Sequence, residues 1–342
     1  MNWQTLKTLC KAPVELPIML ACLLSLSLET SAQAYSDIDT AAERVEQKVI
    51  EWRRQIHQHP ELSNREVKTA ALVADHLLSL GLDVTTEVGV HGVVAVLKGG
   101  QPGDKVIALR ADMDANAVKE MQTLPFKSTR IDETWPEGAV PVMHACGHDA
   151  HTAILMGLAE ALVSVKNELP GTVVFFFQPA EEGAPAGEEG GASLMIKEGV
   201  LEKYRPEAVF GLHVFSNMPT GMIAYRGGPL MAGSDSYRIV VKGRQTHGAR
   251  PWGGVDPVVV SAQIVGGLQT VVSRTLPPRE SGVITVGSFH SGTKHNIISD
   301  RAHLQLTVRN DNLETRQILL DGIKRVAENM GRVAGLPEDM LP

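Results

Sequence analysis

The chain has few aromatic residues and no excess of positive charge. Aromatic side chains make up 4% of its 342 residues, and 32 Lys and Arg are outnumbered by 39 Asp and Glu, for a formal charge of −7. A chain of this kind is poorly suited to neutralising phosphates or stacking bases, so nucleic acid is not an expected partner. Internal repeats are also missing, and the 32 Gly and 19 Pro are spread along the chain, which excludes a low-complexity protein.

A hydrophobic run long enough to span a membrane is missing as well. The apolar stretch at residues 16–28 is shorter than the ~20 residues of a span, and Pro17 interrupts it. Two lysines precede it and a small-x-small triplet follows at 32–34, which is typical of a signal peptide cleaved after Ala34. An uncleaved membrane anchor is the alternative. We therefore expect residues 1–34 to be a signal peptide, no stable membrane anchor, and export to the periplasm or the outside.

Cysteine is scarce, because two of the 3 cysteines lie in the predicted signal peptide and leave Cys146 alone. An exported chain with one cysteine forms no internal disulfide, so Cys146 is a buried thiol, a reactive thiol or a metal ligand. Residues 143–151 hold three histidines and one aspartate beside it. Thiolate and imidazole are good ligands for zinc and similar ions. This segment predicts a metal site in preference to a polar turn.

Hydrophobic periodicity predicts an α/β fold with a mostly parallel central sheet, because helices and strands alternate. Helices are expected at 38–57, 65–80 and 152–165, and buried strands at 93–97, 106–109 and 172–177. Further along the chain the expected elements are strands at 236–241, 282–289 and 302–308 and helices at 257–273 and 313–333. The second group makes a complete α+β unit, so we expect a domain boundary near residues 227–228.

Two further stretches place polar groups at the ends of apolar strands. Glu181 and Glu182 directly follow a predicted buried strand, and ligands gather at the carboxyl ends of strands in open α/β sheets. The same Glu-Glu-Gly tripeptide recurs at 188–190, where we interpret it as a solvated turn. His213 interrupts the apolar segment 209–214. A lone histidine there is commonly a satisfied core residue, but beside the other two stretches a ligand role is favoured.

Taken in order, these motifs resemble those of the M20 metallopeptidase family, and in particular its amidohydrolase branch of hippurate hydrolases and indoleacetyl-amino acid hydrolases. The matching segments are 53–62, 110–114, 144–149, 178–183 and 211–213. The resemblance runs from about Val45 to the end of the chain. It implies a zinc-peptidase-like catalytic domain over 35–227 and an inserted α+β lid and dimerisation domain over 228–335, with residues 336–342 starting the return to the catalytic domain.

The resemblance also implies roles for individual residues of the catalytic domain. The implied metal ligands are Cys146, His148, Glu182 and His213. Glu181 resembles the general base, and Asp114 matches an aspartate that supports the site from outside the ligand set. The implied cofactor is one or two divalent ions, zinc or manganese, with nickel or cobalt as alternatives.

In the lid, the resemblance implies residues that bind substrate. His247 matches a histidine that reaches a neighbouring subunit's active site and binds the substrate carbonyl, and a surface loop histidine is the alternative reading. Asn296 and Arg309 match positions associated with the carboxylate end of the substrate. A homodimer formed through the lid is therefore expected.

The implied activity is metal-dependent hydrolysis of the amide bond of small N-acyl or N-aroyl amino acids. Two alternatives remain open: a dipeptidase or aminopeptidase of the same fold, and a non-catalytic module that keeps the fold for binding or assembly. The intact pair of Glu181 and Glu182 argues against the non-catalytic module, whereas the missing carboxyl-terminal segment described below argues for it.

The sequence departs from the family pattern in two respects. Residues 116–117 replace a usual Leu-Pro pair, Gln245 replaces a usual glycine, and Trp252 stands where a histidine is frequent. These positions border the substrate region and bear on substrate preference, not on reaction type. In addition, the family chain returns from the lid and supplies a final metal-binding histidine, whereas this sequence ends at Pro342. We therefore expect a chain that is incomplete at its carboxyl end and weakly active.

Overall fold

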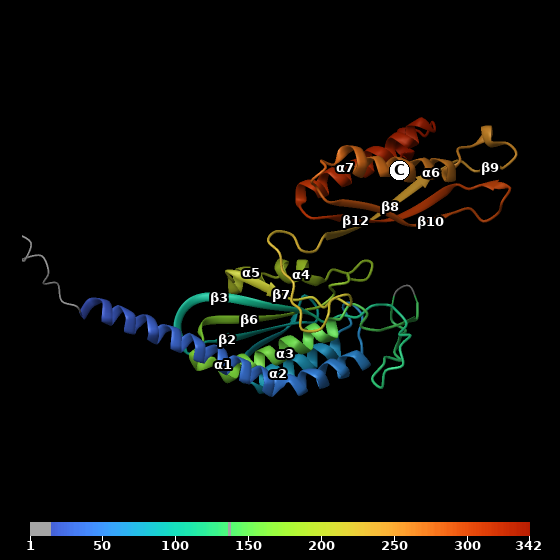
Figure 1. Ribbon diagram of the computed structural model, residues 1–342. Coiled ribbons are helices and arrows are strands. Elements are labelled where there is room, and N and C mark those ends of the chain that lie inside the picture. The colour runs from blue at the N-terminus through green and yellow to red at the C-terminus, as the bar shows by residue number, and fades with distance from the viewer. Residues whose placement is uncertain (1–14, 136–137) are drawn as a thin grey trace, which may run out of the picture. The chain divides into compact units, whose positions relative to one another are not determined.

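The computed structural model describes residues 15–135 and 138–342, with side chains from residue 37 onward (Figure 1). The chain divides into two compact units between Met218 and Pro219, whereas the sequence places the boundary near 227–228. Residues 1–14 of the expected signal peptide lie outside the described residues, and its remainder belongs to the long helix α1 (Glu15–Gln58). Among the described helices, none has both the length and the apolar character that crossing a membrane requires.

A five-stranded mixed sheet with the order β1-β2-β6-β3-β7 forms the centre of the first unit. Its strands are β1 (Asp83–Val88), β2 (Gly92–Lys98), β3 (Gln101–Asp112), β6 (Pro170–Gln178) and β7 (Ala208–Gly211). The pairs β3–β6 and β3–β7 are parallel, while β1–β2 and β2–β6 are antiparallel. The sheet is thus parallel only in part, because β1 and β2 are joined by a short turn, which permits only antiparallel pairing.

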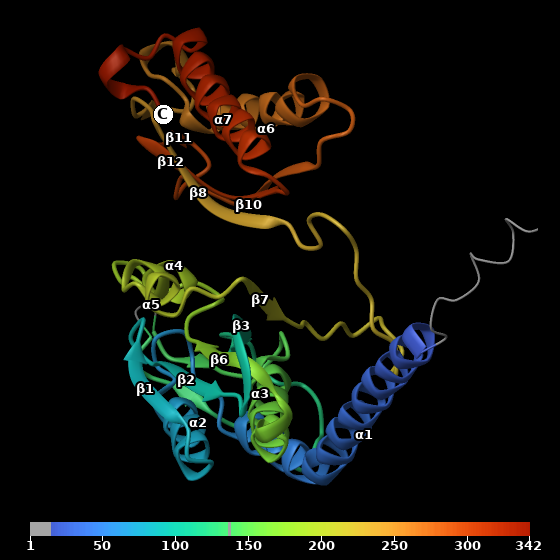
Figure 2. The ribbon, with the colours of Figure 1, turned by 90° about the vertical axis from the view of Figure 1, so that its left-hand side faces the viewer.

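Helices cover both faces of this sheet (Figures 1 and 2). On one face lie α1, α2 (Val67–Ser79) and α3 (His148–Ser164), and on the other lie α4 (Gly191–Lys197) and α5 (Val200–Tyr204). The central strand β6 supplies side chains to both layers, since successive residues of a strand point to opposite faces. Phe175 and Phe177 pack with Leu77 in the first layer, and Phe176 packs with Met195 in the second. Each such burial contributes about 1.5–3 kcal/mol, which fixes the position of the strand end after Gln178.

Strand β7 lies at the edge of the sheet and is far less covered than β6. It pairs only with β3 among the described strands. Val209 and Phe210 are 52% and 56% exposed. The parallel half of the sheet therefore ends in an open apolar strand.

The second unit is a three-stranded antiparallel sheet with the order β10-β12-β8, packed against two helices. Its elements are β8 (Gly233–Lys242), α6 (Pro257–Thr270), β10 (Gly282–Ser291), β12 (Arg301–Asn310) and α7 (Leu313–Val333). Asp256 caps α6 by accepting from the N–H groups of its first turn, and Asn312 caps α7 in the same way. These elements match the α+β order expected from the sequence. Two short pairs complete the described strands: β9 (Thr246–His247) with β11 (Ile297–Ile298), and β4 (Ile131–Asp132) with β5 (Val140–Pro141).

Candidate metal centre

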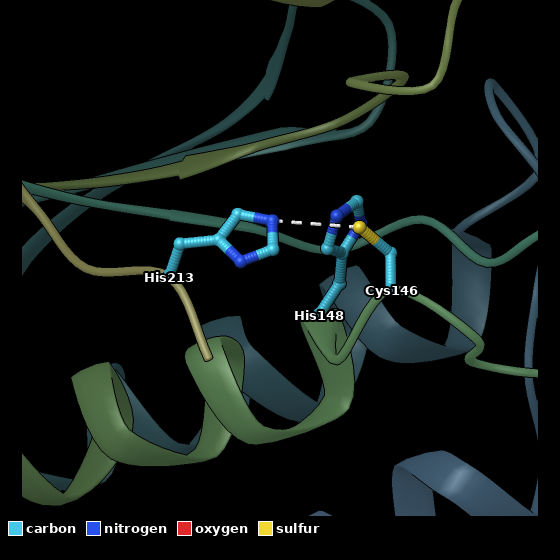
Figure 3. A group of neighbouring side chains, drawn as sticks. All are labelled: Cys146, His148 and His213. Atoms are coloured by element: carbon cyan, nitrogen blue, oxygen red, sulfur yellow. Dashed lines mark hydrogen bonds between the residues drawn. The ribbon is translucent and has the colours of Figure 1, made fainter. Parts of the chain in front are cut away.

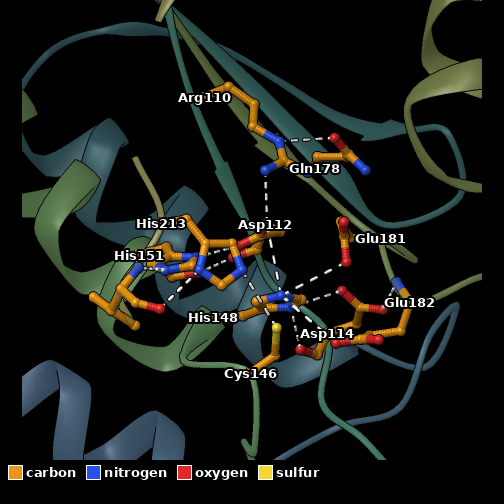
Figure 4. A network of polar contacts seen from close by, with 12 residues as sticks. Arg110, Asp112, Asp114, Cys146, His148, His151, Gln178, Glu181, Glu182 and His213 are labelled. Carbon is orange, nitrogen blue, oxygen red and sulfur yellow. Dashed lines mark hydrogen bonds and ion pairs between the residues drawn. The ribbon is translucent and has the colours of Figure 1, made fainter. Parts of the chain in front are cut away.

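Chemically active side chains gather where the three parallel strands end (Figure 4). Asp112 is the last residue of β3, Glu181 and Glu182 follow the end of β6, and His213 follows β7. Parallel strands present their carboxyl ends at one edge of a sheet, which is where open α/β folds bind ligands. The helix α3, which begins at His148, starts at the same edge.

The turn before α3 brings Cys146 and His148 to the same side of the chain. Gly147, the residue that caps α3, has a φ of 94°, which L side chains rarely adopt. A Cβ at this position would also collide with the side chain of Val214. Glycine is therefore required for the tight turn that separates the two predicted ligands by one residue.

His148 presents one ring nitrogen with no hydrogen-bond partner among the described residues. Its Nδ1 donates to the backbone oxygen of Asp114 at 2.8 Å, so Nε2 is the ring nitrogen left for a metal ion. Nε2 is buried and unpartnered. The nearest carboxylate oxygens lie 3.7 Å away in Asp112, 3.7 Å away in Glu181 and 3.8 Å away in Glu182. A buried, unpartnered ring nitrogen beside three carboxylates is arranged to share a cation with them.

Cys146 and His213 face each other beside His148 (Figure 3). The Sγ of Cys146 lies 3.5 Å from Nε2 of His213, whose Nδ1 donates to the backbone oxygen of Val214 at 2.8 Å. The second histidine therefore also directs a lone pair inward. Ligand atoms at 2.0–2.3 Å from a tetrahedral ion lie roughly 3.5 Å from one another, which matches this spacing.

The electrostatics of the cluster favour an added positive charge. Burial lowers the pKa of His148, but Asp114 and Asp112 raise it more, to about 9. Burial and the neighbouring Glu182 raise the pKa of the Cys146 thiol to about 12. Burial also raises the pKa of Glu181. A divalent cation would oppose all three effects, because it favours the thiolate of Cys146, the carboxylate of Glu181 and the neutral imidazole of His148.

The donors form overlapping groups that share His148. Cys146, His148 and His213 form one group within ligand distance of a common ion, and His148, Glu181 and Glu182 form another. The structure thus brings together all four predicted ligands and the predicted base, although no single group of the described residues contains all of them. Soft sulfur and imidazole with carboxylate oxygens form a donor set that fits zinc or a similar divalent ion.

Asp112 and His151 form a third group with His148 that the sequence did not single out. His151 donates from Nδ1 to Asp112 at 2.7 Å and accepts at Nε2 from the N–H of Val214 at 2.9 Å. Both of its nitrogens are occupied, so His151 supports the segment that carries His213. The sequence contains a signal for Asp112, because it is the last residue of the buried strand β3. The same strand-end position pointed to Glu181, which follows Gln178 at the end of β6.

Asp114 contacts two parts of the centre, the ring of His148 and the backbone of Glu182. Its Oδ1 lies 3.2 Å from Nδ1 of His148, and its Oδ2 accepts from the N–H of Glu182 at 3.0 Å. Ser63 donates to the same Oδ2 at 2.7 Å. Asp114 is almost completely buried, and these hydrogen bonds outweigh burial and lower its pKa. The carboxylate therefore stays charged and holds both a predicted ligand and the chain beside the predicted base.

The three residues expected to bind substrate in the lid belong to the second unit. His247 is exposed on β9, and its neighbour Gly248 donates to the backbone oxygen of Asn296 at 2.8 Å. The Oδ1 of Asn296 is buried and has no partner among the described residues. Arg309 lies elsewhere, near the end of β12 that is remote from Asn296. The second unit thus brings His247 and Asn296 together, but not Arg309.

Comparisons with known proteins agree with this fold and site. The model of peptidase family M20/M25/M40 matches residues 108–329. The thermostable carboxypeptidase 2 of Saccharolobus solfataricus is 40% identical over 85% of this chain and 70% of its own length. The hippurate hydrolase of Campylobacter jejuni is 41% identical over 82% of this chain and 69% of its own.

A solved structure gives the same result. The YXEP protein of Bacillus subtilis, described as a dinuclear metal-binding peptidase of the M20 family, is 35% identical with a TM-score of 0.66. The match covers 86% of this chain and 72% of that one. Fold and site together define a metal-binding hydrolase of amide bonds. The chain belongs to the M20 peptidase family.

Proposed function

We propose that this chain hydrolyses the amide bond of N-acyl or N-aroyl amino acids, with Glu181 as general base. The observation that carries the proposal is the unpartnered Nε2 of His148, which faces Glu181 and Glu182 on one side while Cys146 and His213 complete the donor set on the other. The 41% identity to a hippurate hydrolase supports an N-aroyl amino acid as substrate.

The proposed metal ligands are Cys146, His148, Glu182 and His213. We propose zinc or manganese as the ion, with nickel or cobalt as alternatives, and one or two ions per site. When bound, such an ion lowers the pKa of water and polarises the acyl oxygen. Asp114 and the backbone oxygen of Val214 orient the two imidazoles, so that each directs Nε2 inward.

Glu181 moves the proton in the proposed reaction. Its carboxylate is 39% exposed, so water and substrate can reach it, yet it lies 3.7 Å from Nε2 of His148. Burial raises its pKa, which makes it a better base than an ordinary glutamate. It takes the proton of the attacking water and returns it to the departing amine. We propose that His247 donates to the developing oxyanion and that Asn296, which lies beside it, binds the substrate carboxylate. Arg309 lies near the far end of β12 and has no part in this proposal.

A carboxypeptidase is the second candidate, because the thermostable carboxypeptidase is 40% identical to this chain. A substrate comparison separates the two activities. The chain, supplied with zinc or manganese, is assayed on hippurate, N-acetyl amino acids, N-blocked dipeptides and free dipeptides. Faster turnover of hippurate and N-acetyl amino acids supports the amidohydrolase. Preference for N-blocked dipeptides identifies the carboxypeptidase, and preference for free dipeptides identifies a peptidase that needs a free amine.

We also propose that the chain is exported and loses residues 1–34. The support is the basic start, the short apolar run and the small residues before Tyr35. Expression of the full gene, fractionation of the cells and amino-terminal sequencing of the product test this. A mature protein that begins at Tyr35 outside the cytoplasm is the expected result, and an intact amino terminus would contradict it.

The second unit is proposed to be a lid through which two copies associate. Its helix α6 contains no charged residue, and Val258 and Val259 on its outer side are 42% and 53% exposed. An uncharged, apolar exposed face is typical of an interface. Light scattering should give a dimer for the wild type and a monomer for Val259→Asp. A monomeric wild type would contradict the proposal.

A further inference from the structure

Two buried carboxyl groups hold the backbone on either side of Glu181. The N–H of Ala180 donates to Oε1 of Glu66 at 2.8 Å, and the N–H of Glu182 donates to Oδ2 of Asp114 at 3.0 Å. Glu66 and Asp114 come from segments of the chain that are remote from the 180–183 loop in sequence. The proposed base therefore projects from a short loop that is fixed at both of its neighbours.

The loop needs this support because its backbone is not in a relaxed conformation. Ala180 has a φ of 49°, a left-handed value that a residue with a Cβ rarely adopts, and Gly183 has a φ of 104°. A left-handed non-glycine residue costs about 1–3 kcal/mol and persists only where the surroundings impose it. The hydrogen bond from Ala180 to Glu66 is made by this strained residue itself. Without it, Ala180 can relax and redirect the side chain that follows.

The side chain of Glu66 serves this loop and not its own helix. Glu66 caps α2, yet its side chain makes no hydrogen bond to the first turn of that helix. Glu61 caps the first turn of α2 in its place, because its carboxylate accepts from the N–H groups of Lys68 and Thr69. Glu66 is instead completely buried, with its Oε2 unpartnered among the described residues. A fully buried carboxyl is costly to keep, and its side chain accepts from the N–H of Ala180 in the loop of Glu181.

We propose that Glu66 is a positioning residue for the reaction: it holds Ala180 so that the carboxylate of Glu181 stays directed at the metal centre. The role rests on the proposed function of Glu181 as general base. Glu66 touches neither the proposed ligands nor the reacting atoms. Its effect on turnover is transmitted through the backbone of one residue.

The test compares variants at Glu66 with a matched variant at Glu61. Glu66→Leu keeps the volume without an acceptor, Glu66→Ala removes both, and Glu66→Gln keeps an oxygen that can accept from Ala180. Glu61→Ala removes a buried glutamate five residues away that holds only α2. For each variant we would measure kcat, KM, bound metal, and hydrogen–deuterium exchange of a peptide covering residues 178–184.

The positioning role predicts a specific pattern. Glu66→Leu and Glu66→Ala should lower kcat about 10–100-fold with KM and metal content unchanged, and should speed exchange at Ala180. Glu66→Gln should restore both kcat and slow exchange. Glu61→Ala should lower the melting temperature while leaving kcat and exchange at Ala180 as in the wild type.

Three results would overturn the role. One is wild-type exchange at Ala180 in both Glu66→Leu and Glu66→Ala, and another is a loss of kcat in Glu61→Ala equal to that at Glu66. The third is failure of Glu66→Gln to restore turnover in a folded, metal-loaded protein. A wild type without amidohydrolase or peptidase activity would instead refute the proposed function, and the exchange measurements would still decide whether Glu66 holds the loop.

Discussion

The tripeptide Glu-Glu-Gly occurs twice within ten residues, and the two copies have different surroundings. Glu181 and Glu182 lie within 4 Å of the ring of His148. Glu188 instead forms an ion pair with Arg65 at 2.7 Å, and Glu189 forms one with Lys197 at 2.8 Å. The first pair shares the buried ring of His148, whereas each member of the second has a surface cation of its own. The same residues are available for chemistry in one place and neutralised in the other.

Position after a buried strand creates this difference. The 180–183 loop leaves β6 directly, so the packing of Phe175 and Phe177 fixes where it starts. The 188–190 segment lies farther along the loop, where solvent and surface lysine or arginine side chains can reach it. A carboxylate without a paired cation is retained only where the fold holds it.

Removing the charge of Glu181 should abolish most turnover. Glu181→Gln keeps the size of the side chain but cannot accept a proton, so kcat should fall by about 10²–10⁴ with bound metal retained. Steady-state kinetics on hippurate and elemental analysis of the purified protein would measure both. Glu188→Gln, the equivalent change in the second copy, is the control and should keep nearly full kcat. Equal losses in the two variants would remove the distinction between the copies.

Replacing the thiol of Cys146 should weaken metal binding. Cys146→Ser substitutes a poor ligand at a position 3.5 Å from Nε2 of His213, and loss of a soft ligand should reduce zinc affinity by at least tenfold. Competition with a chelator would measure the affinity. Glu189→Gln should leave it unchanged. Wild-type affinity in Cys146→Ser would mean that the sulfur is not a ligand.

The buried carboxyl of Glu66, which holds the loop of the first Glu-Glu-Gly, should make stability depend on pH. Burial, with a contribution from Asp114, raises the pKa of Glu66 from 4.5 to about 7. The folded state therefore binds more protons than the unfolded state between these values, and the free energy of unfolding should fall by about 3 kcal/mol as pH rises through that window. Urea unfolding at pH 5 and pH 8 should show this fall in the wild type and not in Glu66→Gln.

The second copy should respond in the opposite direction. Hydrogen bonds from Arg65 and Asn64 lower the pKa of Glu188 to about 2. Its stabilising contribution is therefore present above about pH 4.5 and is lost as pH falls toward 2. For Glu66, by contrast, an equal pH dependence of the free energy of unfolding in the wild type and in Glu66→Gln would show that its pKa is not raised.

The smallest effect is expected at Glu189. Its ion pair with Lys197 is exposed, with about two thirds of each side chain in contact with solvent. Exposed pairs contribute little because water screens them. Glu189→Gln should change the free energy of unfolding by less than about 0.5 kcal/mol and leave kcat unchanged. A larger change would give this segment a structural role.

Local sequence patterns predicted the elements and the residues that gather at the site. Hydrophobic spacing predicted α2, α3, α6 and α7, the buried strands β2, β3 and β6, and the order of the α+β unit. It did not predict β1, α4 or α5. Glu181 and Glu182 lie just after the end of β6, as expected, because a buried strand fixes where its end lies. The antiparallel half of the first sheet was not predicted, because strand direction depends on pairing and not on spacing.

Contacts between distant segments could not be predicted in this way. Glu66 reaches Ala180, and Arg65 reaches Glu188, across more than one hundred residues. The same separation explains why 188–190 looked like a simple solvated turn, although Glu188 is tied to the segment that holds the first copy. His151 received no role from the sequence beyond its place in a histidine-rich run. Its two hydrogen bonds become visible only when β3 and the chain after β7 are placed beside it.

The open strand at the edge of the first sheet has a consequence for how the chain behaves in solution. The outer N–H and C=O groups of β7 are a template on which any extended polypeptide can add itself as a new strand. Val209 and Phe210 make such an addition favourable, because each is more than half exposed. In this 342-residue chain, an exposed apolar edge of this kind is a predicted aggregation site, whatever the state of the metal centre.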